Sequence, residues 1–184
     1  IWPDSRYQGE PEFPSYRERG FLIGRGGKYG VYDVEGQVVI DCEWDSVEYS
    51  CGVYIVSEGG KFGLLDRKGS ELTALEYDSL LPGRDDGLFP AKKGEKWGYI
   101  DSGGAVAVDF QYEDACPFID GRGAVRLHGK WTTVDRRGVM APRSFDWILH
   151  GRYWCSEGLM PVCIGEKWGF ADNMGNIVIK AGYK

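Results

Sequence analysis

Short apolar runs alternate with glycine-rich polar segments from about residue 20 to the end of the chain. The runs are rich in β-branched and aromatic residues, as in Tyr54-Ile55-Val56 and Ile177-Val178-Ile179. Runs of this kind, bounded by glycine and aspartate, are typical of β-strands. The pattern therefore predicts an all-β chain whose strands are joined by tight turns.

The pattern occurs five times, because a lysine, an aromatic residue and a small residue recur in sequence. The five copies of this anchor motif are Lys28-Tyr29-Gly30, Lys61-Phe62-Gly63, Lys96-Trp97-Gly98, Lys130-Trp131-Thr132 and Lys167-Trp168-Gly169. Their third residues lie 33, 35, 34 and 37 positions apart. A period of this length indicates a repeat architecture, in which each unit buries apolar side chains against its neighbours. We expect the anchor aromatics to form the core between units, packed against the glycines.

Two turns recur in every copy. An aspartate after the anchor is followed three residues later by a glycine, which is typical of a type I turn with a G1 bulge. These pairs are Asp33 and Gly36, Asp66 and Gly69, Asp101 and Gly104, Asp135 and Gly138, and Asp172 and Gly175. Two-residue hairpin turns precede the anchors at Gly26-Gly27, Gly59-Gly60, Gly94-Glu95, His128-Gly129 and Gly165-Glu166. Each repeat is therefore expected to be a three-stranded antiparallel meander.

A longer connector leads from each meander to the next and opens with an aromatic–acidic pair. The pairs are Trp44-Asp45, Tyr77-Asp78, Tyr112-Glu113 and Phe145-Asp146. This element could be a short fourth strand or a single helical turn. Because a propeller blade needs four strands, three clear strands favour a solenoid-like, curved stack of five meanders over a closed β-propeller-like ring.

These motifs resemble the bacterial WG repeat family, named for the Trp-Gly pair that stands here at Trp97-Gly98 and Trp168-Gly169. The resemblance covers about residues 20–184. Two departures are that Tyr29 and Phe62 replace Trp, and that Thr132 replaces Gly, where we expect a less close backbone approach. The resemblance implies an all-β array without established catalytic chemistry, and it supplies no functional residues.

The chain divides into two parts. Residues 1–19 contain four aromatic residues and three prolines, and we expect an extended arm that covers the first edge strand, since open edges invite aggregation. Residues 20–184 form one repeat domain. Its units are expected at about 20–52, 53–87, 88–122, 123–158 and 159–184.

Composition excludes several classes of partner. The net charge is −6 and no Lys/Arg-rich run occurs, which argues against binding to nucleic acid. No segment approaches the about 20 apolar residues of a membrane-spanning helix. The five cysteines are odd in number, lack any CxxC pair and are interpreted as small core residues. They favour a reducing, cytoplasmic compartment, although a start at Ile1 leaves a preceding signal peptide open.

The sequence contains no catalytic motif. It has two histidines, and no Gly-x-Ser-x-Gly, P-loop or His-Glu-x-x-His pattern occurs. The repeated aspartates are explained by the turns rather than by calcium binding. We therefore predict no enzyme activity, no metal and no cofactor. A hydrolase site assembled from distant carboxylates stays an open alternative.

The longest connector, between the fourth and fifth copies, is the candidate binding site. Its aromatic and basic residues are Arg143, Trp147, His150, Arg152, Tyr153 and Trp154. Arg and Trp are enriched at interface hot spots, although this segment could instead pack over its neighbours. The predicted function is a non-catalytic scaffold that binds a protein partner through its connectors. A carbohydrate-binding module that uses exposed aromatics is the alternative.

Overall fold

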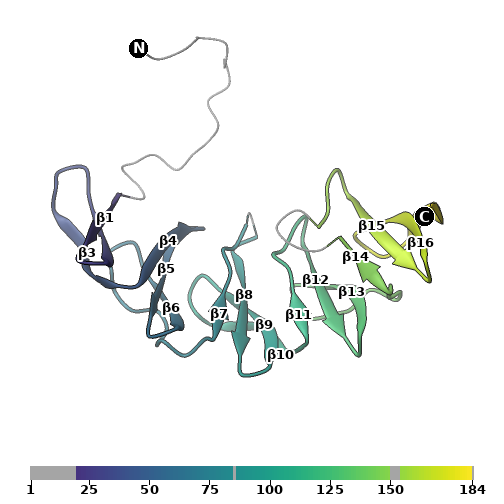
Figure 1. Ribbon diagram of the computed structural model, residues 1–184, viewed down its shortest axis with the longest axis horizontal. Helices are drawn as coiled ribbons and strands as arrows, with labels where there is room; N and C mark the ends of the chain where they lie inside the picture. The colour runs from purple at the N-terminus through teal and green to yellow at the C-terminus, as the bar shows by residue number, and fades with distance from the viewer. Residues whose placement is uncertain (1–19, 85, 150–153, 184) are drawn as a thin grey trace, which may run out of the picture.

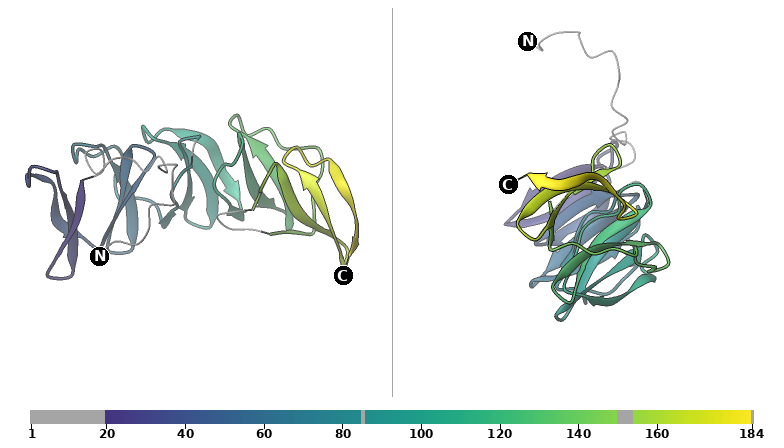
Figure 2. Two further views of the ribbon diagram at one scale, coloured as in Figure 1. Left: turned by 90° about the horizontal axis from the view of Figure 1, so that it is seen from above. Right: turned by 90° about the vertical axis from the view of Figure 1, so that its right-hand side faces the viewer.

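The computed structural model describes residues 20–84, 86–149 and 154–183, and within these ranges the chain contains strands and turns but no helix. Five antiparallel sheets follow one another along the chain in a curved row, with the first and the last at opposite ends (Figure 1). Seen from above, the sheets stand side by side along the long axis (Figure 2). The predicted all-β array is confirmed, whereas the expected arm at 1–19 lies outside the described residues.

Each sheet contains three or four strands in chain order. Sheet 1 contains β1 (Phe21–Arg25), β2 (Lys28–Tyr32) and β3 (Val38–Trp44), and sheet 2 contains β4 (Ser46–Ser50), β5 (Val53–Glu58) and β6 (Lys61–Leu65). Sheet 3 contains β7 (Ser79–Leu80), β8 (Leu88–Lys93), β9 (Lys96–Asp101) and β10 (Val106–Tyr112). Sheet 4 contains β11 (Asp114–Ala115), β12 (Arg122–Leu127) and β13 (Lys130–Asp135). Sheet 5 contains β14 (Trp147–Ile148), β15 (Leu159–Ile164), β16 (Lys167–Asp172) and β17 (Ile177–Tyr183).

The connector element is a strand, not a helical turn. Strands β4, β7, β11 and β14 follow the aromatic–acidic pairs and bond to the first long strand of the next sheet, as Leu80 does opposite Ala91. Positive φ angles at Cys51 (49°) and Gly52 (85°) form a two-residue turn between β4 and β5. Sheets 3 and 5 are therefore four-stranded meanders, the strand number of a propeller blade.

The turns after the anchors form as the sequence predicts. One carboxylate oxygen of Asp66 accepts the backbone N–H groups of Lys68 and Ser70, both at 2.8 Å, and Gly69 has a φ of 81°. The other four copies repeat this geometry. These carboxylates hold the hairpins in register, because they satisfy N–H groups that the bulge leaves out of the ladder.

The anchor glycine makes room for main chain rather than for an aromatic ring. Trp97 lies opposite Tyr112, whereas Tyr99 lies opposite Val108, so that β10 has two extra residues across the step. An ideal Cβ on Gly98 would lie 2.7 Å from the Val108 carbonyl oxygen. The expectation that an aromatic side chain packs on this glycine is therefore wrong, because the bulged third strand occupies the space.

Four apolar clusters fill the spaces between successive sheets. Tyr99 is fully buried between sheets 3 and 4, and its hydroxyl donates a hydrogen bond to the Cys116 carbonyl at 2.7 Å. Of the anchor aromatics, Trp131 is in the core, whereas Tyr29 is 40% exposed. The other three anchors, Phe62, Trp97 and Trp168, are half-buried. Sheet-on-sheet packing is thus confirmed, but most anchor rings lie at its margin.

The aspartates of three connectors, Asp45, Asp78 and Asp146, each link two sheets, whereas Glu113 of the remaining connector makes its ion pair and hydrogen bonds within sheet 4. One oxygen of Asp78 lies 2.5 Å from the Lys61 ammonium, and the other accepts the N–H of Gly94 at 2.7 Å, in the turn between β8 and β9 of sheet 3. The Lys61 ammonium and this N–H hold the pKa of Asp78 below its usual value. Asp45 and Asp146 make the same two contacts in their own connectors. Three of the anchor lysines, Lys28, Lys61 and Lys130, thus contribute to the junctions between sheets.

No helix long and apolar enough to cross a bilayer occurs among the described residues.

Candidate binding site

The predicted binding residues lie in different surroundings. His150, Arg152 and Tyr153 are outside the described residues. Trp154 is fully buried between sheets 4 and 5, and its indole N–H donates to the Pro117 carbonyl at 2.7 Å. Trp154 therefore packs against its neighbours, which is the alternative that the sequence leaves open for this connector, because the ring fills the core and its one polar atom is satisfied.

Trp147 and Arg143 are both exposed, but they lie on different segments of the chain. Trp147 on β14 is 38% exposed and packs edge-to-face on Trp168, with ring centroids 5.5 Å apart. Arg143 belongs to the segment 140–144, which leads from the fourth repeat toward β14. Of the predicted residues that the structure describes, only Arg143 therefore lines the pocket of the fourth repeat.

That pocket forms where Thr132 replaces the anchor glycine. Thr132 is buried, and its hydroxyl lies 3.4 Å from the carbonyl oxygen of Ala141 and 3.0 Å from that of Arg143. A threonine leaves no room for the close backbone approach seen at Gly98. The hydroxyl instead holds the passing segment at hydrogen-bond distance, and Pro142 has no N–H to donate to a ladder.

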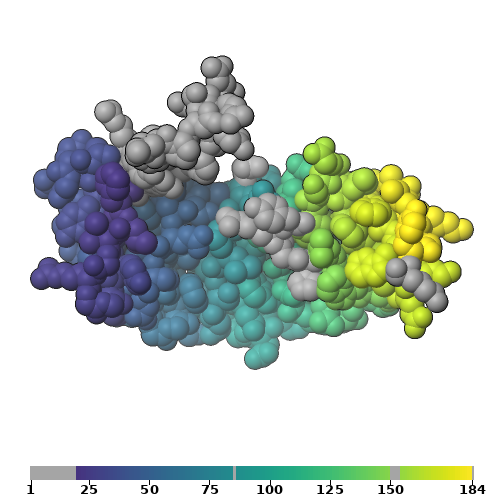
Figure 3. Space-filling model, turned by 45° about the horizontal axis from the view of Figure 1, so that its top comes forward, coloured from purple at the N-terminus to yellow at the C-terminus, as the bar shows by residue number. Residues whose placement is uncertain are grey.

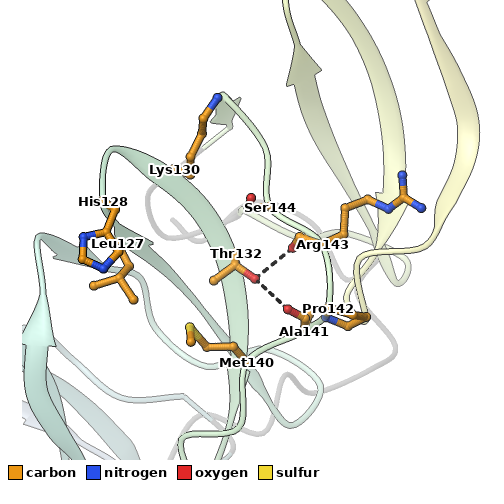
Figure 4. A pocket seen from close by; sticks show the side chains of 9 residues that line it. All are labelled: Leu127, His128, Lys130, Thr132, Met140, Ala141, Pro142, Arg143 and Ser144. Carbon is orange, nitrogen blue, oxygen red and sulfur yellow. Dashed lines mark hydrogen bonds between the residues drawn. The ribbon is translucent and has the colours of Figure 1, made fainter.

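A pocket of about 310 Å³ lies between this segment and the hairpin that joins β12 to β13 (Figure 4). Its described lining residues are Leu127, His128, Lys130, Thr132, Met140, Ala141, Pro142, Arg143 and Ser144. The Arg143 side chain points away from Thr132, toward sheet 5, so this residue lines the pocket with its main chain (Figure 4). The pocket thus has an apolar wall beside an exposed basic margin.

Charged side chains at this margin interact across the junction between sheets 4 and 5. Lys130 forms an ion pair with Asp146, whose second oxygen accepts the N–H of Gly165 at 2.6 Å. The ammonium of Lys130, followed by this N–H, lowers the pKa of the Asp146 carboxyl. Asp146 thus stays ionised and keeps the Lys130 side chain over the junction. His128 is exposed in the turn, with a φ of 50°.

Where the structure describes it, the pocket lacks the groups of side chains that typically hold a sugar ring or a metal ion. No Trp, Tyr or Phe is among the described residues that line the pocket, so it offers no stacking platform for a sugar ring. No group of three or more His, Cys, Asp or Glu side chains that could hold a metal occurs among the residues described. The repeated aspartates are engaged in turns and junctions, where each accepts backbone N–H groups.

The sequence reading missed Leu127, Met140 and Pro142, which form the apolar wall. Thr132 could have indicated this wall in the sequence, because a side chain at the anchor glycine position must displace the segment that crosses it. Among the described residues of the fourth repeat, the crossing segment forms no strand and pairs with β13 only at isolated bridges, Met140 with Val134 and Phe145 with Trp131. The expectation of a less close backbone approach at Thr132 stays a prediction.

Known proteins share the repeat and the fold. A family model of the WG containing repeat matches residues 29–62, 62–97, 97–131 and 168–184. No curated protein sequence matches the chain. Hsv2 from Kluyveromyces lactis, a solved structure with a propeller-like fold, has a TM-score of 0.50 at 10% identity, over 89% of this chain and 59% of its own.

Two further solved structures are similar to the chain. Hsv2 with its loop 6CD replaced by a Gly-Ser linker has a TM-score of 0.51 at 10% identity, over 86% of this chain and 60% of its own. BamB from Moraxella catarrhalis has a TM-score of 0.49 at 12% identity, over 86% of this chain and 64% of its own. The chain thus spans less than two thirds of each, and the likeness to Hsv2 shows a shared propeller-like fold alone. Because the repeat model matches more than half of its residues, the chain belongs to the WG containing repeat family.

Proposed function

We propose that this chain is a non-catalytic scaffold that binds a partner protein at the pocket of its fourth repeat. The observation that carries the proposal is the break in the repeat at Thr132. The crossing strand lies against the anchor glycine in repeats such as the third, whereas here the buried Thr132 side chain faces the crossing segment beside a hollow of about 310 Å³.

The row of sheets supports a scaffold role. Buried clusters join every pair of neighbouring sheets, and acidic residues such as Asp78 and Asp146 tie the junctions. A frame packed in this way presents its connectors at fixed positions, which is how repeat proteins commonly bind partners. Little conformational entropy is then lost when a partner binds.

The chemistry of the pocket favours one class of partner segment. Leu127, Met140 and Pro142 offer an apolar wall, His128 is exposed in the adjoining turn, and the Arg143 side chain extends from the pocket toward sheet 5. An extended segment that places an apolar side chain in the pocket and a carboxylate on the side of sheet 5 would match both parts. Met140 is 48% exposed, so its burial by such a segment would release water from apolar surface.

Photocrosslinking in producing cells tests the proposal. A photoreactive amino acid at Met140 is expected to capture a specific protein, and Arg143→Glu in the same chain is expected to abolish the capture. The matched control is the same amino acid at Val106, which occupies the corresponding position of the third repeat and is 53% exposed. Equal capture at both positions, or capture that Arg143→Glu leaves unchanged, would contradict a site at this pocket.

A further inference from the structure

Each sheet has two faces, and the interior of the row shows what each face requires. We call the face toward the next sheet in the chain the forward face, and the opposite one the backward face. On forward faces, Ile40 in sheet 1 and Val108 in sheet 3 are 4% and 3% exposed, in contact with the following sheet. These positions are therefore core positions wherever another sheet follows.

The forward face of sheet 5 carries the same positions, and no sheet of the described residues covers them. Phe170 lies opposite Ile179, as Tyr99 lies opposite Val108 in sheet 3. Ile179 is nevertheless 39% exposed, about ten times the exposed fraction of its counterparts.

The connector aromatic shows the same contrast. Tyr183 lies opposite Trp168, as Tyr112 lies opposite Trp97. Tyr183 is 63% exposed, whereas Tyr112 is fully buried. The C-terminal residues, which include Ile179 and Tyr183, lie at one end of the molecule, in yellow (Figure 3).

The backward face of sheet 1 carries the complementary positions at the other end. In sheet 3 the backward positions Ala91 and Ile100 are fully buried against sheet 2. Their counterparts in sheet 1 are Ile23, which lies opposite Gly30 as Ala91 lies opposite Gly98, and Tyr32. Ile23 is 40% exposed and Tyr32 is half-buried.

We propose that the forward face of sheet 5 docks on the backward face of sheet 1 of a second copy of this chain. The contact would continue the packing that joins sheets 1 to 5 within one copy, since both faces carry the residue positions that are buried there. Such a head-to-tail contact is heterologous, so it leads to open rows of copies or to a closed ring. Burial of Ile179 and Tyr183 against apolar partners supplies the driving force.

A mixing experiment with two surface variants tests the direction of the contact. Ile179→Asp removes the forward face, and Ile23→Asp removes the backward face. The unaltered chain is expected to increase in mass with concentration in analytical ultracentrifugation, and each variant alone is expected to stay monomeric. An equal mixture of the two variants is expected to give a dimer, because one intact face of each kind remains. Val106→Asp, at an apolar site of similar exposure away from both faces, should associate like the unaltered chain.

The other outcomes overturn the proposal. A monomer at all concentrations would show that copies do not dock. If Ile23→Asp alone still forms dimers, the forward faces pair with each other instead of head to tail. If Ile179→Asp associates as strongly as the unaltered chain, the contact lies elsewhere. Both altered residues are exposed, and circular dichroism and tryptophan fluorescence of each variant would verify that its fold is intact.

Discussion

Gly98 lies so close under Val108 that an ideal Cβ on the glycine would be 2.7 Å from the valine carbonyl oxygen. The obstacle is main chain, which cannot rotate away as a flexible side chain could. Gly98→Val should therefore force β10 away from β9 and lower the free energy of unfolding by about 3 kcal/mol. Urea unfolding followed by tryptophan fluorescence measures this change.

The control for this substitution is Gly24→Ala. A Cβ at Gly24 would meet only the ring of Tyr29, at 3.4 Å, and its φ is not in the left-handed region. We expect an unfolding midpoint close to that of the unaltered chain. If Gly98→Val were as stable as this control, the close approach of β10 would not constrain the anchor.

Asp78 has two contacts, and substitutions can separate them. Asp78→Asn loses the ion pair with Lys61 but can still accept the N–H of Gly94, whereas Asp78→Ala loses both. Exposed ion pairs contribute little to stability. The asparagine variant should therefore unfold at a urea concentration close to that of the unaltered chain, and the alanine variant at a lower one. Equal losses for the two variants would mean that the ion pair, not the turn contact, stabilises this junction.

Stability should fall in acid because of the junction carboxylates. Lysine ammonium groups, followed by backbone N–H groups, hold the folded-state pKa values of Asp45, Asp78 and Asp146 below the usual value of about 3.9. A depressed folded pKa means that the unfolded chain binds protons first. The contribution is therefore complete above about pH 4 and is lost as pH falls through the folded values. Urea midpoints at about pH 6, 4 and 3 would show this decline, and a midpoint that rises toward pH 3 would contradict it.

Two tryptophans of the predicted site should respond differently to truncation. Trp154→Ala removes a fully buried ring and orphans the Pro117 carbonyl, so we expect a loss of about 3–5 kcal/mol. Trp147 is 38% exposed, and its alanine variant should lose much less. Thermal unfolding of both variants gives the comparison. A similar melting temperature for the two would place Trp154 outside the core.

The candidate site was only partly readable from the sequence. Arg143 and the departure at Thr132 are visible in the chain, but the wall that includes Met140 depends on how far the crossing segment stands from β13. The burial of Trp154 depends on its neighbours in sheets 4 and 5. Residue type alone made this tryptophan look like a contact residue, because large aromatics are common both in cores and at interfaces.

The repeat, its turns and the all-β class follow from local chemistry, since an aspartate three residues before a glycine favours one hairpin geometry wherever it stands. The tertiary structure decided that the connectors pair as strands with the next sheet, that β10 bulges over Gly98, and which faces are buried. These features depend on contacts between residues of different strands and sheets. Such contacts are set by packing and by hydrogen bonding across space, which no single segment of the sequence encodes.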